Sequence, residues 1–361
     1  MESYLHKAWV ETMTRERARL QFSDPTSPVA QRAPSCAAAY SVATAESPEN
    51  TRLNRYSNIM PYDRSRVILP SGVYLNASWV KELAGGRWTV ATQAPLNRTV
   101  HTFLSMFLLP LSPPQSSASG VASETPSANR LRTIVQLTPN VEGQAQKAFR
   151  YFPNDIGEEL VWPPPPGIQS PSIKVKLAQV KFPEEETDEP SWVHSALEVS
   201  YEGSQEPPRL IRHLHYLGWP DHGIPTDVRS LLQFMMFVDA CNMDSTHPDA
   251  AINPEPPIVV GCSAGVGRTG TYIAIRSLLR TLGLNQPPTE SITAQPKADW
   301  TGAPSQPSPL GPISAEFSED KIILEVDALR DQRTMMVQAF EQFKFLYTTV
   351  LAAIDLGQQQ Q

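Results

Sequence analysis

The chain has 361 residues, of which 40% are hydrophobic and 19% charged, enough for one large α/β domain or two small ones. Its formal net charge of −7 argues against a general nucleic-acid binder. The 3 cysteines are odd in number and widely spaced, which argues against a disulfide framework and favours a reducing compartment, the cytoplasm or the nucleus. The N-terminus lacks the apolar core of a signal peptide, and no apolar run approaches the roughly 18 residues of a membrane span.

Residues 1–49 predict a helix followed by a linker. Apolar side chains recur roughly on one side of a surface helix over 4–22. Residues 23–50 are rich in Pro, Ser and Ala and indicate a loop wrapped over the domain or a disordered linker. The apolar positions of the helix are Leu5, Trp9, Met13 and Leu20.

Most of the chain, residues 50–355, alternates between apolar periodic segments and turn signals, and a frayed tail follows at 356–361. Pro/Ser-rich or acidic insertions interrupt it near 111–129, 154–190 and 283–317. The patterns predict strands at 74–80, 88–95, 133–137, 173–182, 195–201, 209–216 and 258–260, and helices at 99–109, 228–241, 272–280, 322–329 and 343–350.

The most informative stretch is 257–280, where a buried strand, a glycine-rich loop and a helix follow one another. Backbone N–H groups of such a loop and of the helix start converge on one point, and the helix dipole adds positive charge there. We therefore expect an anion site. Cys262 and Arg268 both face it: the loop dipoles and the arginine favour the nucleophilic thiolate, and the planar guanidinium can bind phosphate bidentately.

Other interpretations of this loop fit less well. Residues 265–270 match the dinucleotide pattern GxGxxG, but that pattern needs a second strand ending in an acidic residue about 20 positions on, where 286–290 predict a loop. The absence of Gly-Lys-Ser/Thr excludes a nucleotide triphosphate loop. A merely buried cysteine leaves the glycines and Arg268 unexplained.

The string resembles the signature of the protein tyrosine phosphatase family, His-Cys-x5-Arg-Ser/Thr, with Gly261 in place of the histidine. Further blocks that resemble the family are Asn54-Arg55-Tyr56, Pro61-Tyr62-Asp63, the segment 219–225 (WPDHGIP), and the glutamines near 338–342. The resemblance covers about 50–355. It implies a single α/β domain with a twisted mixed β-sheet flanked by helices and a phosphate-binding loop between strand and helix.

The same resemblance implies a two-step reaction without a metal or cofactor. Cys262 attacks phosphorus while Asp221 protonates the leaving oxygen and then acts as the base for a water molecule. Gln342 orients this water with the help of Gln338, and the hydroxyl of Thr269 stabilises the departing thiolate.

Substrate contacts also follow from the resemblance. Tyr56 lines a deep slot and stacks on the phenyl ring, which selects phosphotyrosine over the shorter phosphoserine. Asn58 stands where many members carry an aspartate that hydrogen-bonds the substrate backbone, so we expect weaker peptide anchoring. Phosphoryl oxygens are bound by Arg268 and by the backbone of Ser263, Ala264, Gly265, Val266 and Gly267.

Supporting roles fall to Trp219, the hinge of the movable acid loop, to Glu142, which pairs with Arg268, and to Lys147, which contacts the acid loop. The alternative for Glu142 and Lys147 is two exposed loop charges. We interpret three histidines as packing and turn residues rather than metal ligands: His213, His215 and His222.

The predicted function is that of a protein tyrosine phosphatase acting on phosphotyrosine-containing proteins, and we expect a monomer. Two alternatives stay open. Gly261 and Asn58 are compatible with a phosphotyrosine-binding pseudoenzyme, although Cys262, Asp221 and Arg268 are all present. A broader phosphatase for phosphoserine or phosphoinositides would not need the slot lined by Tyr56.

Overall fold

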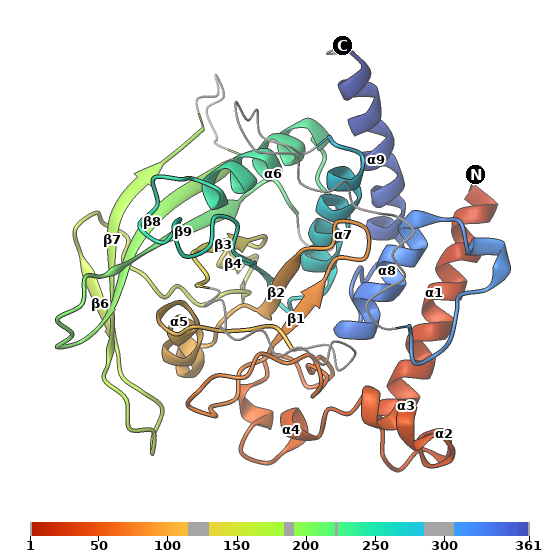
Figure 1. Ribbon diagram of the computed structural model, residues 1–361, viewed down its shortest axis with the longest axis horizontal. Helices are drawn as coiled ribbons and strands as arrows, with labels where there is room; N and C mark the ends of the chain where they lie inside the picture. The colour runs from red at the N-terminus through yellow and green to blue at the C-terminus, as the bar shows by residue number, and fades with distance from the viewer. Residues whose placement is uncertain (1, 115–129, 184–190, 221–222, 285–306, 360–361) are drawn as a thin grey trace.

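An eight-stranded mixed sheet forms the centre of the computed structural model, which describes residues 2–114, 130–183, 191–220, 223–284 and 307–359 (Figure 1). Its middle strands are parallel: β10 pairs with β2 and β3, and β3 pairs with β9. The outer strands run antiparallel to their neighbours. In spatial order the strands are β1 (Ala77–Lys81), β2 (Trp88–Gln93), β10 (Ile258–Cys262), β3 (Thr133–Gln136), β9 (Arg209–Tyr216), β8 (Trp192–Tyr201), β7 (Ile173–Lys181) and β6 (Glu159–Trp162).

Helices cover both faces of the sheet. The helix α5 packs on one face, and α6, α7, α8 and α9 pack on the other, with α1 lying along the outer side of α8 (Figure 1). A small hairpin, β4 (Val141–Glu142) and β5 (Ala145–Gln146), stands apart from the main sheet. The helices are α1 (Glu2–Ser23), α2 (Pro28–Arg32), α3 (Pro34–Ala39), α4 (Ala43–Glu46), α5 (Val100–Leu108), α6 (Val228–Asn242), α7 (Gly267–Thr281), α8 (Lys321–Gln332) and α9 (Phe340–Gln359), with 3-10 turns at Thr51–Leu53, Asn97–Thr99 and Ala315–Phe317.

The alternation of side chains along the central strand divides the core into two parts. Successive residues of a strand point to opposite faces. Val259 of β10 therefore belongs to the cluster that contains Phe103 of α5, whereas Val260 belongs to the cluster that contains Ile273 of α7. Both valines are fully buried, so β10 is anchored from both sides just before Cys262.

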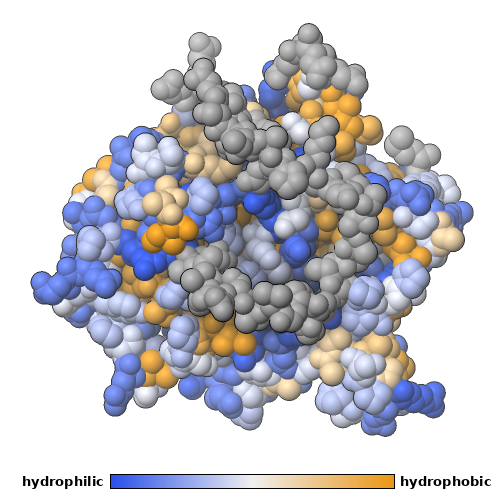
Figure 2. Space-filling model, in the orientation of Figure 1, coloured by the Kyte–Doolittle hydropathy of each residue, from blue (hydrophilic) through white to orange (hydrophobic). Residues whose placement is uncertain are grey.

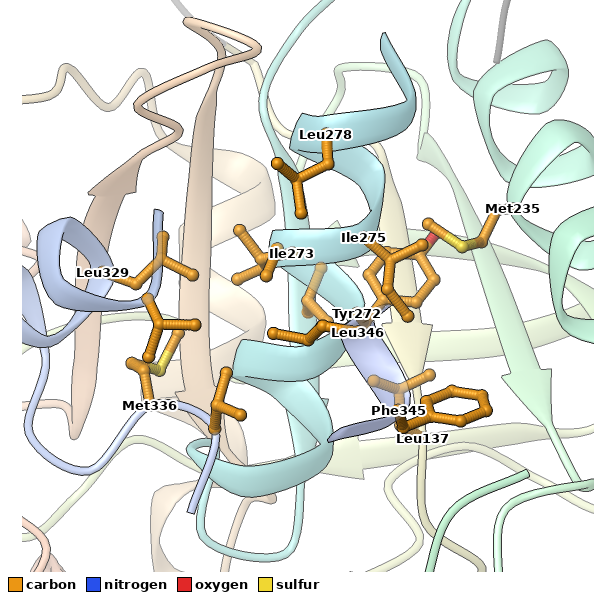
Figure 3. Packing of buried hydrophobic residues seen from close by; sticks show 14 of the residues in the cluster. Leu137, Met235, Tyr272, Ile273, Ile275, Leu278, Leu329, Met336, Phe345 and Leu346 are labelled. Carbon is orange, nitrogen blue, oxygen red and sulfur yellow. The ribbon is translucent and has the colours of Figure 1, made fainter. Parts of the chain in front are cut away.

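The helix α7 is buried on almost all sides, which fixes the position of its first turn. Figure 3 shows Ile273 facing Leu329 and Met336, while Ile275 and Tyr272 lie toward Met235 of α6. On the face of the molecule seen in Figure 2, the described hydrophobic side chains lie in small patches among hydrophilic ones. Among the described residues, no helix is both long and apolar enough to cross a bilayer.

The α/β fold with a mixed sheet flanked by helices is confirmed, and the predicted strands and helices occur in the predicted order. Three segments differ from the expectation. Within 23–50, α2, α3 and α4 form, and Tyr40 is fully buried, so this stretch is not a simple linker. The insertion 154–190 contributes β6 as well as the predicted β7, and α9 continues through the expected frayed tail to Gln359.

The buried face of α1 differs from the predicted apolar side. Leu20 is exposed, whereas Arg15, Glu16 and Arg19 are buried. These charged residues face α8, where Arg15 Nε lies 2.8 Å from Asp327 Oδ1. Hydrophobic periodicity could not reveal this face because ion pairs, not apolar contacts, make up much of the interface.

A buried carboxylate joins the turn between β1 and β2 to α7 and α8. Glu325 accepts hydrogen bonds from the backbone N–H groups of Leu83 (3.1 Å) and Ala84 (2.8 Å) and from the hydroxyl of Ser277 (2.8 Å). Burial raises the pKa of Glu325 to about 7, although these donors oppose the shift. The nearby buried Glu82 raises the pKa further.

We predict that the stability of Glu325→Gln relative to wild type increases as pH rises from 5 to 8, because only the wild type carries the titrating carboxyl. A carboxyl whose pKa is raised on folding stabilises the native state fully below its unfolded pKa, and this contribution is lost as pH rises toward about 7. The difference in unfolding free energy between variant and wild type should increase by on the order of 2 kcal/mol. Thermal unfolding across this pH range measures it, with exposed Glu319→Gln as the control. A difference that does not change with pH would contradict the prediction.

Candidate active site

The candidate site lies at the carboxyl end of the central strand β10. Residues 262–268, the phosphate loop, connect this strand to α7, which begins at Gly267. The neighbouring strands β2 and β3 run parallel to β10, so the carboxyl ends of all three lie on the same side of the sheet. Ligands of α/β proteins commonly bind at this side. The Cys262 side chain is 6% exposed, and the backbone N–H of Gly265 points at its sulfur at an N···Sγ distance of 3.3 Å.

Two glycines, one in the loop and one at the start of α7, are required by close approach. Gly265 has φ of 73°, and a Cβ there would lie 2.2 Å from the backbone oxygen of Thr92 in β2. A Cβ on Gly270 would lie 2.5 Å from the backbone nitrogen of Val337. Backbone from elsewhere in the chain therefore encloses the loop, and larger residues would push it apart.

Arg268, in the first turn of α7, connects three segments around the loop. Its Nη1 donates to Glu142 Oε1 (2.7 Å) and to the backbone oxygen of Leu137 (3.1 Å). Its Nη2 donates to the backbone oxygen of Pro220 at 3.0 Å. Arg268 is 7% exposed and makes these three hydrogen bonds, so the orientation of its guanidinium is fixed before any ligand arrives.

The two supporting residues from the β4–β5 region lie beside Arg268. Glu142, in β4, also accepts a hydrogen bond from the hydroxyl of Thr138 at 3.2 Å. Lys147 Nζ lies 3.8 Å from Glu142 Oε2. The pairing of Glu142 with Arg268 is thus present, and the alternative of two exposed loop charges does not describe this carboxylate.

The acid loop, residues 219–225, begins with Trp219, whose side chain is 1% exposed. Its indole Nε1 donates to the backbone oxygen of Gly223 at 3.0 Å and closes the base of the loop. Asp221 and His222, the predicted acid and its neighbour, lie outside the described residues. The contact between Pro220 and Arg268 joins the start of this loop to the phosphate loop.

Tyr56 borders the phosphate loop from the N-terminal side. Its hydroxyl lies 2.9 Å from Ser263 Oγ, and Ser263 Oγ donates to the backbone oxygen of Lys147 at 2.9 Å. The Tyr56 side chain is 37% exposed, so part of its ring faces solvent beside the loop. The predicted substrate-binding Asn58 is exposed two residues further on.

The glutamines contact the other side of the loop. Gln342 Oε1 accepts from the backbone N–H groups of Gln338 (3.1 Å) and Ala339 (3.3 Å). A Cβ on Gly267 would lie 3.0 Å from this oxygen, so the amide of Gln342 lies over the phosphate loop. Gln342 is buried, whereas Gln338 is exposed. Thr269 is fully buried, and its hydroxyl has no hydrogen-bond partner within the part of the chain that the structure describes.

Sequence reasoning missed Arg333, which is completely buried behind the loop. Its Nε donates to the backbone oxygen of Gly265 (2.8 Å) and its Nη2 to that of Ala264 (3.1 Å). It also donates to Asn76 Oδ1 (2.8 Å) and Ser78 Oγ (3.1 Å). Burial lowers the pKa of Arg333 to about 10. The only signal in the sequence is an arginine two positions before the apolar run 335–337.

His213 and His215 are packing residues of the sheet. His213 Nε2 lies 3.1 Å from Gln136 Oε1, and His215 Nε2 lies 3.0 Å from the backbone oxygen of Thr138. Burial holds the pKa of both imidazoles below the usual range, so they are neutral at pH 7. Across the described ranges, no group of three or more His, Cys, Asp or Glu side chains could hold a metal ion.

No strand follows α7 in the described part of the chain, and residues 286–290, where the dinucleotide pattern needs its second strand to end, lie outside the described residues. The family model described as protein-tyrosine phosphatase matches residues 50–109 and 127–294.

Three relatives share this region. The chain is 27% identical over 316 residues to rat tyrosine-protein phosphatase non-receptor type 21, a match of 85% of this chain and 21% of the relative. It is 28% identical over 316 residues to human tyrosine-protein phosphatase non-receptor type 14, again 85% of this chain and 21% of the relative. It is 30% identical over 244 residues to chicken receptor-type tyrosine-protein phosphatase eta, 66% of this chain and 14% of the relative. The chain thus spans about a fifth or less of their length.

These findings agree with the geometry of the site. The family model covers more than half of the chain and includes both Cys262 and Arg268. The prediction made from the loop sequence is therefore confirmed: the chain belongs to the protein-tyrosine phosphatase family.

Proposed function

We propose that the chain hydrolyses phosphotyrosine in proteins through a phosphocysteine intermediate. In the first step Cys262 Sγ bonds to phosphorus, the bond between phosphorus and the tyrosine oxygen breaks, and Asp221 gives its proton to that oxygen. In the second step a water molecule held by Gln342, with Gln338 assisting, attacks phosphorus. Asp221 takes its proton, the sulfur–phosphorus bond breaks, and phosphate leaves with the thiolate restored.

The observation that carries this proposal is the arrangement of Cys262 and Arg268 around one loop. The N–H of Gly265 lies 3.3 Å from the sulfur, and Arg268 is fixed by Glu142 at 2.7 Å. Preorganised donors of this kind stabilise the charge that develops on the phosphoryl oxygens in the transition state. The buried hydroxyl of Thr269, which has no hydrogen-bond partner among the described residues, supports a role as donor to the departing thiolate.

Selection of phosphotyrosine is supported by Tyr56. Its hydroxyl lies 2.9 Å from Ser263 Oγ, a contact that holds the aromatic ring at the border of the loop. A phosphorylated side chain must extend past this ring to bring its phosphate to the loop. The phenyl group of phosphotyrosine is long enough to do so and can stack on the Tyr56 ring. Serine phosphate is too short for this.

Cys36, Cys241 and Cys262 are all free, in keeping with the reducing cytoplasm or nucleus that we propose as the compartment of the protein.

Replacement of the nucleophile tests the proposal directly. We expect Cys262→Ser to abolish phosphate release from a phosphotyrosine peptide while the variant still binds the peptide, because the loop amides and Arg268 remain. Cys36→Ser is the matched control and should retain full turnover. Wild-type protein should release phosphate from the phosphotyrosine peptide at least tenfold faster, as a rough bound, than from the phosphothreonine equivalent. Turnover by Cys262→Ser equal to that of wild type would contradict the mechanism.

The support of Arg268 by Glu142 gives a second prediction. Glu142→Ala leaves the guanidinium without its carboxylate partner, so we expect kcat/KM for p-nitrophenyl phosphate to fall by about 10- to 100-fold. The control is Glu159→Gln, which removes an exposed ion pair with Lys174 on β6 and β7. Steady-state kinetics measure both. An unchanged kcat/KM in a folded Glu142→Ala variant would show that the loop orients Arg268 without it.

Gly261 favours a second candidate function, a phosphotyrosine-binding protein without turnover. A Cβ at this position would lie 3.2 Å from the backbone oxygen of Thr92, so Gly261→His needs a shift of a few tenths of an ångström. We expect wild type to show a bell-shaped pH–rate profile whose acidic limb moves lower in Gly261→His. No turnover in wild type with recovery in the variant would instead identify a binder. Phosphate release against pH decides between them.

A further inference from the structure

The loop between α8 and α9, residues 333–337, has a strained backbone next to the phosphate loop. Met335 and Val337 both have φ of 57°, a left-handed conformation that is unfavourable for non-glycine residues. Val337 N donates to the backbone oxygen of Val266 at 3.3 Å. The surrounding structure must therefore hold this conformation in place.

A carboxylate from the other end of the sequence holds it. Glu16 of α1 is 1% exposed, and its Oε1 accepts hydrogen bonds from the Thr334 hydroxyl (2.9 Å) and the Met335 backbone N–H (2.8 Å). On the same side, Arg330 donates to the backbone oxygens of Met336 (2.8 Å) and Val337 (2.7 Å). Arg330 also donates to the backbone oxygen of Thr12 in α1 at 3.1 Å.

The helix α1 is fixed against α8 by other residues, so the role of Glu16 is separable. Arg15 Nε lies 2.8 Å from Asp327 Oδ1, and Arg19 Nε lies 2.9 Å from Asp331 Oδ1. Figure 1 shows α1 lying along α8 over much of its length. Neither α1 nor the 333–337 loop falls within the residues matched by the family model.

The held loop leads directly to the glutamine that faces the phosphate site. Val337 is followed by Gln338, whose N–H donates to Gln342 Oε1 at 3.1 Å. This amide lies over Gly267 of the phosphate loop. Figure 3 shows Met336 packed beside Leu329 against α7, which adds an apolar anchor to the same loop. A displacement at Met335 is thus transmitted to the Gln342 amide within a few residues.

We propose that Glu16 is a positioning residue for the second step of the reaction, the hydrolysis of phosphocysteine. The inference rests on the proposed function. Glu16 holds the backbone of Met335, the strained loop holds Gln338, and the N–H of Gln338 orients the Gln342 amide that directs water at phosphorus. Attack of Cys262 on substrate does not use the Gln342 amide, so loss of Glu16 slows the second step more than the first.

Rapid mixing of the full chain with p-nitrophenyl phosphate tests this inference. For Glu16→Ala we expect a first burst of p-nitrophenol within about twofold of the wild-type rate, followed by a steady-state rate lowered about tenfold, since small misplacements cost large factors. Glu16→Gln, whose amide oxygen still accepts both hydrogen bonds, should have a steady-state rate between those of Glu16→Ala and wild type. Acid quenching should trap more phosphocysteine than in wild type. Arg15→Gln, which loosens α1 without touching the 333–337 loop, should lower the melting temperature but leave both rates unchanged.

Thr334→Val removes the hydroxyl that donates to Glu16, so it breaks the same contact from the side of the loop. It should slow the second step less than Glu16→Ala does. This variant tests the inference even if the Glu16 variants do not fold. The inference is overturned if folded Glu16 and Thr334 variants keep the wild-type steady-state rate. It is also overturned if burst and steady-state rates fall by the same factor in the Glu16 variants, or if Arg15→Gln lowers the steady-state rate as much as they do. Failure of wild type to form any phosphocysteine would overturn the proposed function instead.

Discussion

A loop that directs its backbone N–H groups at an anion must turn carbonyl groups the other way, into the protein. At the phosphate loop these carbonyls are buried and need donors. Arg333 supplies them: one guanidinium donates to the oxygens of Ala264 and Gly265, and Asn76 and Ser78 hold its remaining edge. Its pKa near 10 keeps it charged at neutral pH despite complete burial. The conformation of the anion site therefore depends on a cation that never faces the anion.

A buried arginine in turn needs a rigid support, which explains the charged interior on this side of the molecule. Arg333 follows α8, and α8 is fixed to α1 through buried carboxylate–guanidinium contacts rather than through an apolar seam. Such pairs add little net stability because desolvation offsets their attraction, but they specify geometry strictly. The strained φ angles of Met335 and Val337 persist in this setting because hydrogen bonds from two helices determine the backbone between them.

The sequence identified those parts of the site that are encoded locally. The phosphate loop could be predicted because its small residues, Cys262 and Arg268 lie within one turn between a strand and a helix. Glu142 could be placed beside Arg268 only through the family resemblance, since 126 positions separate them. Arg333 and Glu16 could not be predicted, because their contacts depend on how distant helices pack. The short strand β6 and the helices between 28 and 46 carry patterns too brief for periodicity to detect.

The backbone oxygen of Thr92 links Gly261 to Cys262, the proposed nucleophile. An added Cβ would reach this oxygen at 3.2 Å from Gly261 and at 2.2 Å from Gly265, so both glycines pack against the same point of β2. Any side chain at position 261 must move β2 relative to β10. That movement changes the space in which Gly265 holds its left-handed turn, and the N–H of Gly265 is the group that points at the sulfur of Cys262. A side chain at residue 261 would therefore reach the proposed nucleophile indirectly, through β2 and the turn at Gly265.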